Sequence, residues 1–146
     1  MENTETNNEP LVGAYVSKSD ARASFTLPTV DISDEFDRQV IIAEGTKEIY
    51  QGHPTTLLFP DGKTLLCTWT SGHGGGCGFL KRSEDGGRTW SELQDLPKSW
   101  SDTQNCPTLF RLPDPNGQHR VFVYAGSGPD GCMQMAFSED GGKSWS

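Results

Sequence analysis

Two histidines are the side chains in this sequence best suited to acid–base chemistry. His53 stands directly before Pro54, and His73 lies within the glycine-rich run Ser71–Cys77. An imidazole titrates near neutrality and serves as a general acid or base, and the glycines beside His73 allow a ligand to approach closely. Both are therefore candidate catalytic residues in a polar pocket. Alternatively, His53 caps the start of a strand and His73 only occupies a glycine loop.

A nine-residue motif occurs twice, as Ser83–Ser91 and Ser138–Ser146, and the copies differ only where Arg88 and Thr89 become Lys143 and Ser144. Its aspartate can accept hydrogen bonds from backbone N–H groups just downstream, as in Asx-turns. The Gly-Gly pair supplies positive φ, and the tryptophan offers a large apolar face. The motif therefore predicts a fastened hairpin turn, although a calcium or catalytic role for the aspartates is an alternative. The predicted structural residues are Ser83, Asp85, Gly87, Thr89 and Trp90, and Ser138, Asp140, Gly142, Ser144 and Trp145.

Apolar segments around the two motifs predict short antiparallel strands. These segments are His53–Phe59, Thr64–Trp69 and Gly78–Arg82 around the first motif, and Cys106–Leu112, Arg120–Tyr124 and Met133–Phe137 around the second. With one more strand after each motif, each unit makes a four-stranded sheet, the first over about 50–94 and the second, incomplete, over about 105–146. A further strand is predicted over Arg38–Glu44, after an acidic, loosely structured lead-in over 1–37.

The nine-residue motif is the Asp box of sialidases (neuraminidases) and other BNR-repeat proteins, and residues 50–146 resemble that group. The resemblance implies an all-β fold, a six-bladed β-propeller of which this chain carries about two blades. In that family the Asp box is structural and closes the turn between the third and fourth strands. The resemblance also implies that Arg38–Glu44 closes the ring and that the remaining blades belong to a longer chain or, alternatively, to other copies.

Sialidase sites occupy the face opposite the Asp boxes, where strand entrances and the loops after second strands meet. By resemblance, Gln51, Asn105 and Asp130 are candidate substrate-binding residues beside His53 and His73. Two family features are missing. Gly52 stands where sialidases carry the first arginine of a carboxylate-binding triad, and no acid lies between Trp69 and Cys77. The nucleophile pair and the other two arginines would come from later blades.

The resemblance implies part of a sialidase-like glycoside hydrolase, which removes a terminal sugar such as sialic acid and needs no cofactor. Two blades alone cannot surround a substrate, so no turnover is expected from this chain by itself. The alternative is a non-catalytic Asp-box propeller that binds a carbohydrate or a protein. Either way, the expected partner is a carbohydrate or glycoconjugate.

Charge and hydropathy argue against other partners. Of the net charge of −8, residues 1–37 carry −6, so the remainder is nearly neutral and has no basic stripe for nucleic acid. No apolar run approaches membrane-spanning length. The start, Met1–Glu5, is polar and acidic and is no signal peptide. The compartment therefore stays open between a cytoplasmic protein and a secreted or periplasmic parent whose natural beginning is missing.

The cysteines and tryptophans are assigned to packing. Cys67 lies in an apolar strand, where a buried free thiol is expected. Cys77 and Cys132 occupy equivalent repeat positions and, with Cys106 and the two histidines, could be imagined around zinc, but no C-x-x-C spacing supports a metal site. The four tryptophans are expected to pack between strands rather than to stack on sugars. They are Trp69, Trp90, Trp100 and Trp145.

Overall fold

The computed structural model describes residues 14–15, 29–73, 76–96, 100, 103–104, 106–127 and 131–146. The chain falls into two compact units, residues 1–39 and 40–146. In the first unit, strand β1 (Ala14–Tyr15) pairs antiparallel with β2 (Thr29–Val30), and a 3-10 helix, η1, spans Phe36–Arg38. In the described part of the chain, no helical segment has the length and apolar character needed to cross a bilayer.

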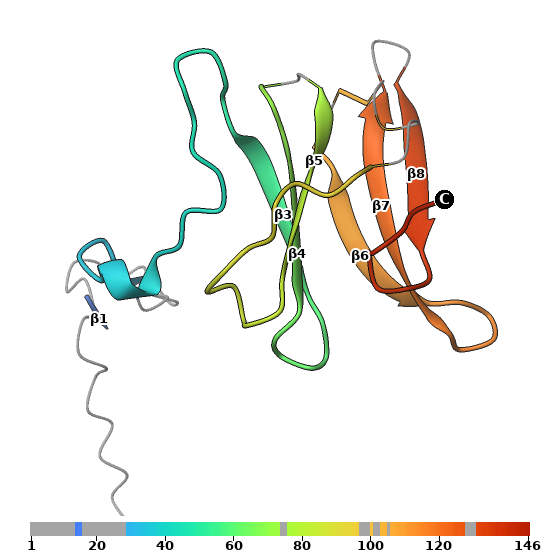
Figure 1. Ribbon diagram of the computed structural model, residues 1–146, viewed down its shortest axis with the longest axis horizontal. Coiled ribbons are helices and arrows are strands. Elements are labelled where there is room, and N and C mark those ends of the chain that lie inside the picture. Colours follow the sequence, from blue (N-terminus) through green and yellow to red (C-terminus); the bar gives the residue numbers. More distant parts are fainter. Residues whose placement is uncertain are drawn as a thin grey trace, which may run out of the picture. The chain divides into compact units, whose positions relative to one another are not determined.

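The second unit is all-β and consists of two antiparallel three-stranded sheets (Figure 1). The first sheet contains β3 (Gly52–Leu58), β4 (Leu65–Thr70) and β5 (Cys77–Ser83). The second contains β6 (Thr108–Pro113), β7 (His119–Ser127) and β8 (Cys132–Ser138). In each sheet the strands lie side by side in sequence order. The all-β class is confirmed, and the six strands predicted around the motifs are present.

The strand predicted over Arg38–Glu44 is wrong. Arg38 ends η1, and no strand occurs between residues 39 and 51. The β-branched run Val40–Ile42 instead lines a groove beside the first sheet, and its backbone is tied there by a side chain, because Lys81 Nζ donates to the Ile42 carbonyl at 2.9 Å. Val40 and Ile41 are 46% and 74% exposed, so this apolar run is neither paired in a sheet nor buried, and it lacks the half-buried pleated surface that strand propensity reflects.

The fourth strand predicted after the first nine-residue motif exists only as irregular backbone. Ser91 N–H donates to the Arg82 carbonyl at 2.8 Å, and Gln94 N–H donates to the Leu80 carbonyl at 2.9 Å. The spacing between these two bonds is three residues on one side and two on the other, so the segment cannot continue as a regular ladder. In the second repeat, Ser146 N–H donates to the Phe137 carbonyl at 3.0 Å, which is the position equivalent to the bond between Ser91 and Arg82.

The two sheets pack face to face around the core. Leu66 and Leu80 of the first sheet meet a set from the second sheet, with Trp100 beside them. That set is Leu109, Val121, Val123 and Ala136. Two long-range hydrogen bonds join the sheets: Thr55 Oγ1 donates to the Pro107 carbonyl at 2.8 Å, and Arg82 Nη1 donates to the Gly141 carbonyl at 2.7 Å.

The two sheets are stacked so that their equivalent faces point in the same direction, and not so that their equivalent faces are turned toward each other. Ser83, which opens the first Asp box, pairs with Leu65, whereas Ser138, which opens the second, pairs with Val121. Leu66 therefore corresponds to Phe122, and Leu66 faces the second sheet while Phe122 lies on that sheet's outer face with Phe110 and Phe137. The second sheet is therefore a displaced copy of the first. Its outer face is equivalent to the face of the first sheet that the second sheet covers.

Both Asp boxes fold into the same hydrogen-bonded turn, which we call the clasp. In the first clasp, Asp85 accepts from Thr89 Oγ1 at 2.6 Å, Thr89 N–H at 2.9 Å and Ser83 Oγ at 2.8 Å. In the second, Asp140 accepts from Ser144 Oγ at 2.6 Å, Ser144 N–H at 2.9 Å and Ser138 Oγ at 2.7 Å. These donors satisfy both carboxylates inside the turn, which is the structural arrangement predicted from the sequence.

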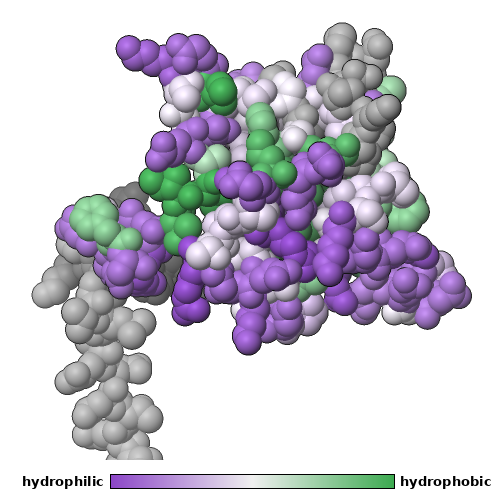
Figure 2. All heavy atoms as spheres, in the orientation of Figure 1, coloured by the Kyte–Doolittle hydropathy of each residue, from purple (hydrophilic) through white to green (hydrophobic). Residues whose placement is uncertain are grey.

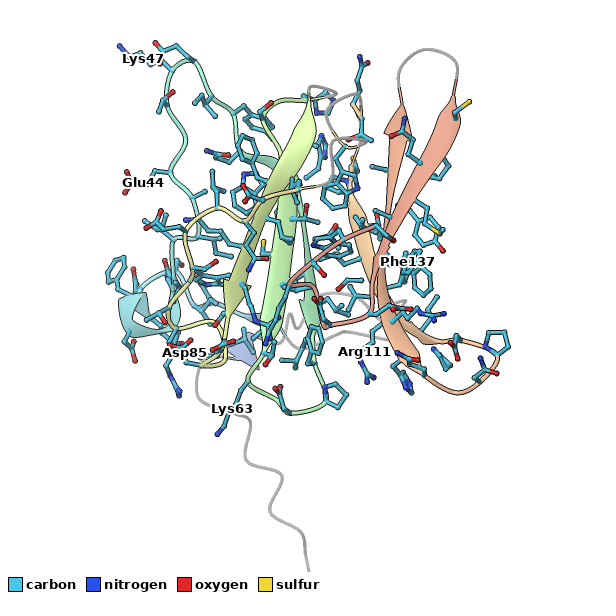
Figure 3. The ribbon with its side chains drawn as sticks, turned by 45° about the vertical axis from the view of Figure 1, so that its right-hand side comes forward. Glu44, Lys47, Lys63, Asp85, Arg111 and Phe137 are labelled. Carbon is cyan, nitrogen blue, oxygen red and sulfur yellow. The ribbon has the colours of Figure 1, made fainter. Side chains whose placement is uncertain are left out.

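The clasps also share their glycine geometry and their end of the sheets. Gly87 and Gly142 have φ of 86° and 89°, and their N–H groups donate to Ser83 Oγ at 2.9 Å and Ser138 Oγ at 2.7 Å. Asp85 lies at the same end of the first sheet as Lys63 (Figure 3), whose carbonyl accepts from Gly86 N–H at 2.8 Å. The contact between Arg82 and Gly141 places the second clasp at this end as well.

Candidate functional site

The end of the first sheet opposite its clasp is distorted by two bulges. Between β3 and β4, His53 and Pro54 stand opposite Trp69 alone, because pairing passes from Gly52–Thr70 directly to Thr55–Thr68. Between β4 and β5, Gly78 is the extra residue. The second sheet keeps an unbroken register along both of its pairings. Bulges re-aim side chains and are frequent next to active sites, so this end of the first sheet is the candidate site.

The bulge brings the two predicted histidines together. His53 has a left-handed backbone with φ of 51°, the single positive φ among the described non-glycine residues. Its Nε2 lies 2.9 Å from Nδ1 of His73, and the ring centroids are 4.8 Å apart with an interplanar angle of 42°. Histidine is among the residues that tolerate this conformation, and such strain persists where the surroundings impose it. One ring donates and the other accepts, so at least one of the two imidazoles is neutral while the bond holds.

Polar contacts hold the two histidine-bearing segments in place. Thr70 Oγ1 is buried and lies 3.1 Å from the Gly52 carbonyl and 2.7 Å from the Gly72 carbonyl, so one hydroxyl links the residues preceding His53 and His73. The loop after β4 is closed because Ser71 N–H and Ser71 Oγ both donate to the Gly76 carbonyl, at 3.0 and 3.1 Å. The imidazoles therefore project from anchored backbone.

Gly52 occupies a tight position beside Tyr50 and the loop that carries His73. Gly52 is buried, and a Cβ built on it would stand 2.6 Å from Tyr50 Cε1 and 3.1 Å from the Gly72 carbonyl oxygen. Any side chain at this position would displace the tyrosine ring and the loop that carries His73. An arginine at this position would therefore require the exposed Tyr50 ring to move and the Gly72 carbonyl to shift slightly.

Gln51, another predicted binding residue, has its amide engaged away from the histidine pair. The Gln51 amide already has partners at both ends: Nε2 donates to the Glu44 carbonyl at 2.8 Å, and Oε1 accepts from Trp69 Nε1 at 2.6 Å. Gln51 therefore fixes Trp69 rather than presenting a free amide. Asn105 and Asp130 lie outside the described residues, and so does the side chain of Cys77.

A groove on the outer face of the first sheet was not predicted from the sequence. It has a volume of about 300 Å³ and lies where apolar side chains gather beside that sheet (Figure 2). It is lined by Val40, Ile41, Ile42, Ala43, Gln51, Pro54, Cys67 and Trp69. Burial raises the pKa of the Cys67 thiol to about 11, so this free cysteine is an apolar wall group and not a nucleophile. The apolar run Val40–Ile42 is the sequence feature that contributes to this groove, although its pattern predicts a strand.

The tryptophans pack inside the second unit. Trp69 is buried and stacks on Phe79 with centroids 5.5 Å apart, and Trp100 is buried against Trp145 with centroids 5.6 Å apart. Trp90 Nε1 donates to the Gly87 carbonyl at 3.0 Å within its own clasp. Trp69, Trp100 and Trp145 therefore fill space between backbone elements, whereas the Trp90 indole lies against its own turn.

Neither a cluster of metal ligands nor a similar known protein identifies what this site does. Within the described ranges, no group of three or more His, Cys, Asp or Glu side chains lies together around a shared point. Comparison with protein-family models, curated proteins and solved structures finds no match in any of the three. The histidine end of the first sheet must therefore be interpreted from its own geometry.

Proposed function

We propose that this chain forms two consecutive blades of a sialidase-like, Asp-box β-propeller belonging to a glycoside hydrolase, and that His53 and His73 help to bind a terminal sugar. The observation that carries the proposal is the same-sense stacking of two sheets, each fastened by the same clasp at the same end. A sandwich of two unrelated sheets has no reason to repeat both features. A propeller repeats them by construction.

The outer face of the second sheet supports further blades. Phe110, Phe122 and Phe137 lie in one row across β6, β7 and β8, and Phe110 is 44% exposed. Through the repeat they correspond to Leu57, Leu66 and Arg82, which face the second sheet. Adding a third sheet by the same step would cover this aromatic row, as the second sheet covers Leu66.

The sugar site is proposed at the histidine end for geometric reasons. The clasps occupy one end of the strands, and the double bulge and the histidine pair occupy the other. Imidazole N–H groups and acceptors suit sugar hydroxyls. Hydrolysis itself needs paired acidic groups or an acid with a nucleophile, so in this proposal the chain contributes binding and the catalytic pair comes from further blades.

Chemical-shift mapping with the full chain tests this proposal. Sialic acid, galactose and N-acetylglucosamine are titrated separately into ¹⁵N-labelled protein, with affinity expected on the order of millimolar for a half-open site. The amides of Gly52, His53, Thr55 and Thr70–His73 should shift with one of them, and His53→Asn with His73→Ala should abolish the shifts. The matched control, His119→Ala at the clasp end of β7, should leave them intact. Shifts confined to other residues, or none with any sugar, would refute the sugar site.

A second candidate is a non-catalytic propeller that binds a carbohydrate or protein. Gly52 favours it, because a carboxylate-gripping arginine there would require the Tyr50 ring to move and the Gly72 carbonyl to shift slightly. Hydrolysis of a fluorogenic sialoside by a version extended with further blades favours the enzyme. Sugar binding by that version without hydrolysis of any fluorogenic glycoside favours the binding module.

A further inference from the structure

The histidine pair has a spacing that matches metal coordination. Two nitrogens bound to one metal at about 2.0–2.1 Å with an angle of about 90° lie about 2.9 Å apart, whereas the wider angle of tetrahedral zinc requires about 3.3–3.4 Å. His53 Nε2 and His73 Nδ1 are 2.9 Å apart. The spacing therefore corresponds to neighbouring positions in a square-planar or octahedral site.

From this spacing we propose that His53 Nε2 and His73 Nδ1 together bind a divalent transition metal of the Cu²⁺ or Ni²⁺ type. Imidazole suits these metals, which prefer tetragonal geometry, while Mg²⁺ and Ca²⁺ prefer oxygen ligands. The ion would take the place of the hydrogen bond between the two rings, and the proton of the donor ring would move to that ring's other nitrogen. Its remaining positions would hold water, because no third ligand joins the pair among the residues that the structure describes.

The backbone favours this site because both rings are positioned before the ion arrives. The left-handed conformation of His53 is imposed by the bulge opposite Trp69, and Thr70 and Ser71 anchor the segment that carries His73. Pre-positioned ligands lose little conformational entropy on binding. Since His53 is half-buried and His73 is exposed, an ion can reach the pair from solvent.

Calorimetric titration of the full chain with NiCl₂, in a buffer that does not bind metals and with no sugar present, tests the proposal. One Ni²⁺ per chain is expected, bound more tightly than Zn²⁺. Loss of one of two ligands should weaken binding more than loss of a residue that merely orients a ligand, which typically costs about 10–100-fold. His53→Asn, in which asparagine tolerates the same left-handed backbone, and His73→Ala should each lose at least about tenfold.

The chain supplies matched controls. His119→Ala removes the remaining histidine, and Cys106→Ser removes an exposed thiol; both should bind Ni²⁺ as the parent does. With Cu²⁺, electron paramagnetic resonance should show hyperfine splitting from two imidazole nitrogens. Unchanged Ni²⁺ affinity in both His53→Asn and His73→Ala, or loss of binding in His119→Ala or Cys106→Ser, would overturn the proposal. Because no sugar is used, the outcome is independent of the proposed sugar site.

Discussion

The two sheets agree at one end and differ at the other. At the clasp end, the aspartates of both repeats accept the same three hydrogen bonds, with distances that agree within 0.1 Å. At the other end, only the first sheet has bulges, and only the first carries the histidine pair. The position equivalent to His53, counted from the shared Pro54 and Pro107, is Cys106.

This difference separates structural from functional candidates without any related sequence. A residue needed by every sheet must recur in each repeat, as Asp85 and Asp140 do. A residue that serves a ligand need occur only once, as the paired His53 and His73 do. The repeated set should therefore affect stability, and the unrepeated set should affect binding.

The largest loss of stability is expected from a substitution at Gly142, because this glycine of the second clasp lies against the core and Gly87 of the first clasp does not. A Cβ on Gly142 would lie 2.5 Å from Leu66 Cδ1 in the core, whereas a Cβ on Gly87 would meet only Trp90 Cζ2 at 3.8 Å. Both substitutions strain a left-handed backbone, at about 1–2 kcal/mol, but only Gly142→Ala also overpacks the core. Its total should be about 3 kcal/mol. Urea denaturation measures both variants, and equal losses would contradict the asymmetry.

A smaller and symmetric loss is expected from the clasp serines. Ser83 and Ser138 are buried at 1% and 2% exposure, and each accepts from the glycine N–H of its own clasp. Alanine at either position leaves that N–H without its partner, at about 1–3 kcal/mol. Thermal unfolding should show similar losses for the two variants. Ser146→Ala, at an exposed hydroxyl, is the control and should change stability by less than about 0.5 kcal/mol.

Acid should weaken the clasps in a defined pH range. The Thr89 hydroxyl and N–H, with Ser83 Oγ, lower the pKa of Asp85 from 3.8 to about 2, and Ser144 with Ser138 lowers the pKa of Asp140 further. A carboxyl with a lowered folded pKa stabilises the protein above its unfolded pKa, and this contribution is lost as pH falls through the folded value. The urea midpoint should therefore fall from about pH 4 to pH 2. In Asp85→Asn and Thr89→Val the fall should be shallower; an unchanged slope in both would contradict this account.

The smallest expected change in stability is a gain, and it concerns His53. His53 occupies a left-handed conformation that glycine adopts without strain, so His53→Gly should keep or raise stability by up to about 1 kcal/mol. The same variant should lose Ni²⁺ binding. His73→Gly is the control for the lost ring contact. A destabilisation above about 1 kcal/mol in His53→Gly alone would assign the residue a structural role.

Local sequence chemistry predicted most of the second unit. The clasps were predictable because serine, aspartate and glycine act within nine residues, and the six strands were predictable from apolar alternation bounded by turns. The prediction for Arg38–Glu44 failed because strand propensity reflects packing on a half-buried sheet, whereas Val40 and Ile41 stay 46% and 74% exposed beside a groove. The fourth strand failed because its register shift between Ser91 and Gln94 leaves no trace in the pattern of residue types.

The site was only half predictable. The residue types at positions 53 and 73 indicated acid–base chemistry, but their contact depends on two bulges and on the left-handed backbone of His53, which no residue type specifies. Gln51 was expected to bind substrate, yet its amide is engaged by Trp69 and the Glu44 carbonyl. Whether an amide is free depends on tertiary packing and cannot be judged from spacing.

The order of strands has a consequence for biosynthesis. Because each sheet uses only neighbouring segments, β3–β5 and the first clasp can form before β6–β8 have left the ribosome. Leu66 and Leu80 then remain uncovered until β6–β8 emerge. During that interval the half-finished protein presents an apolar sheet face to solvent, and exposed apolar surface of this kind favours aggregation.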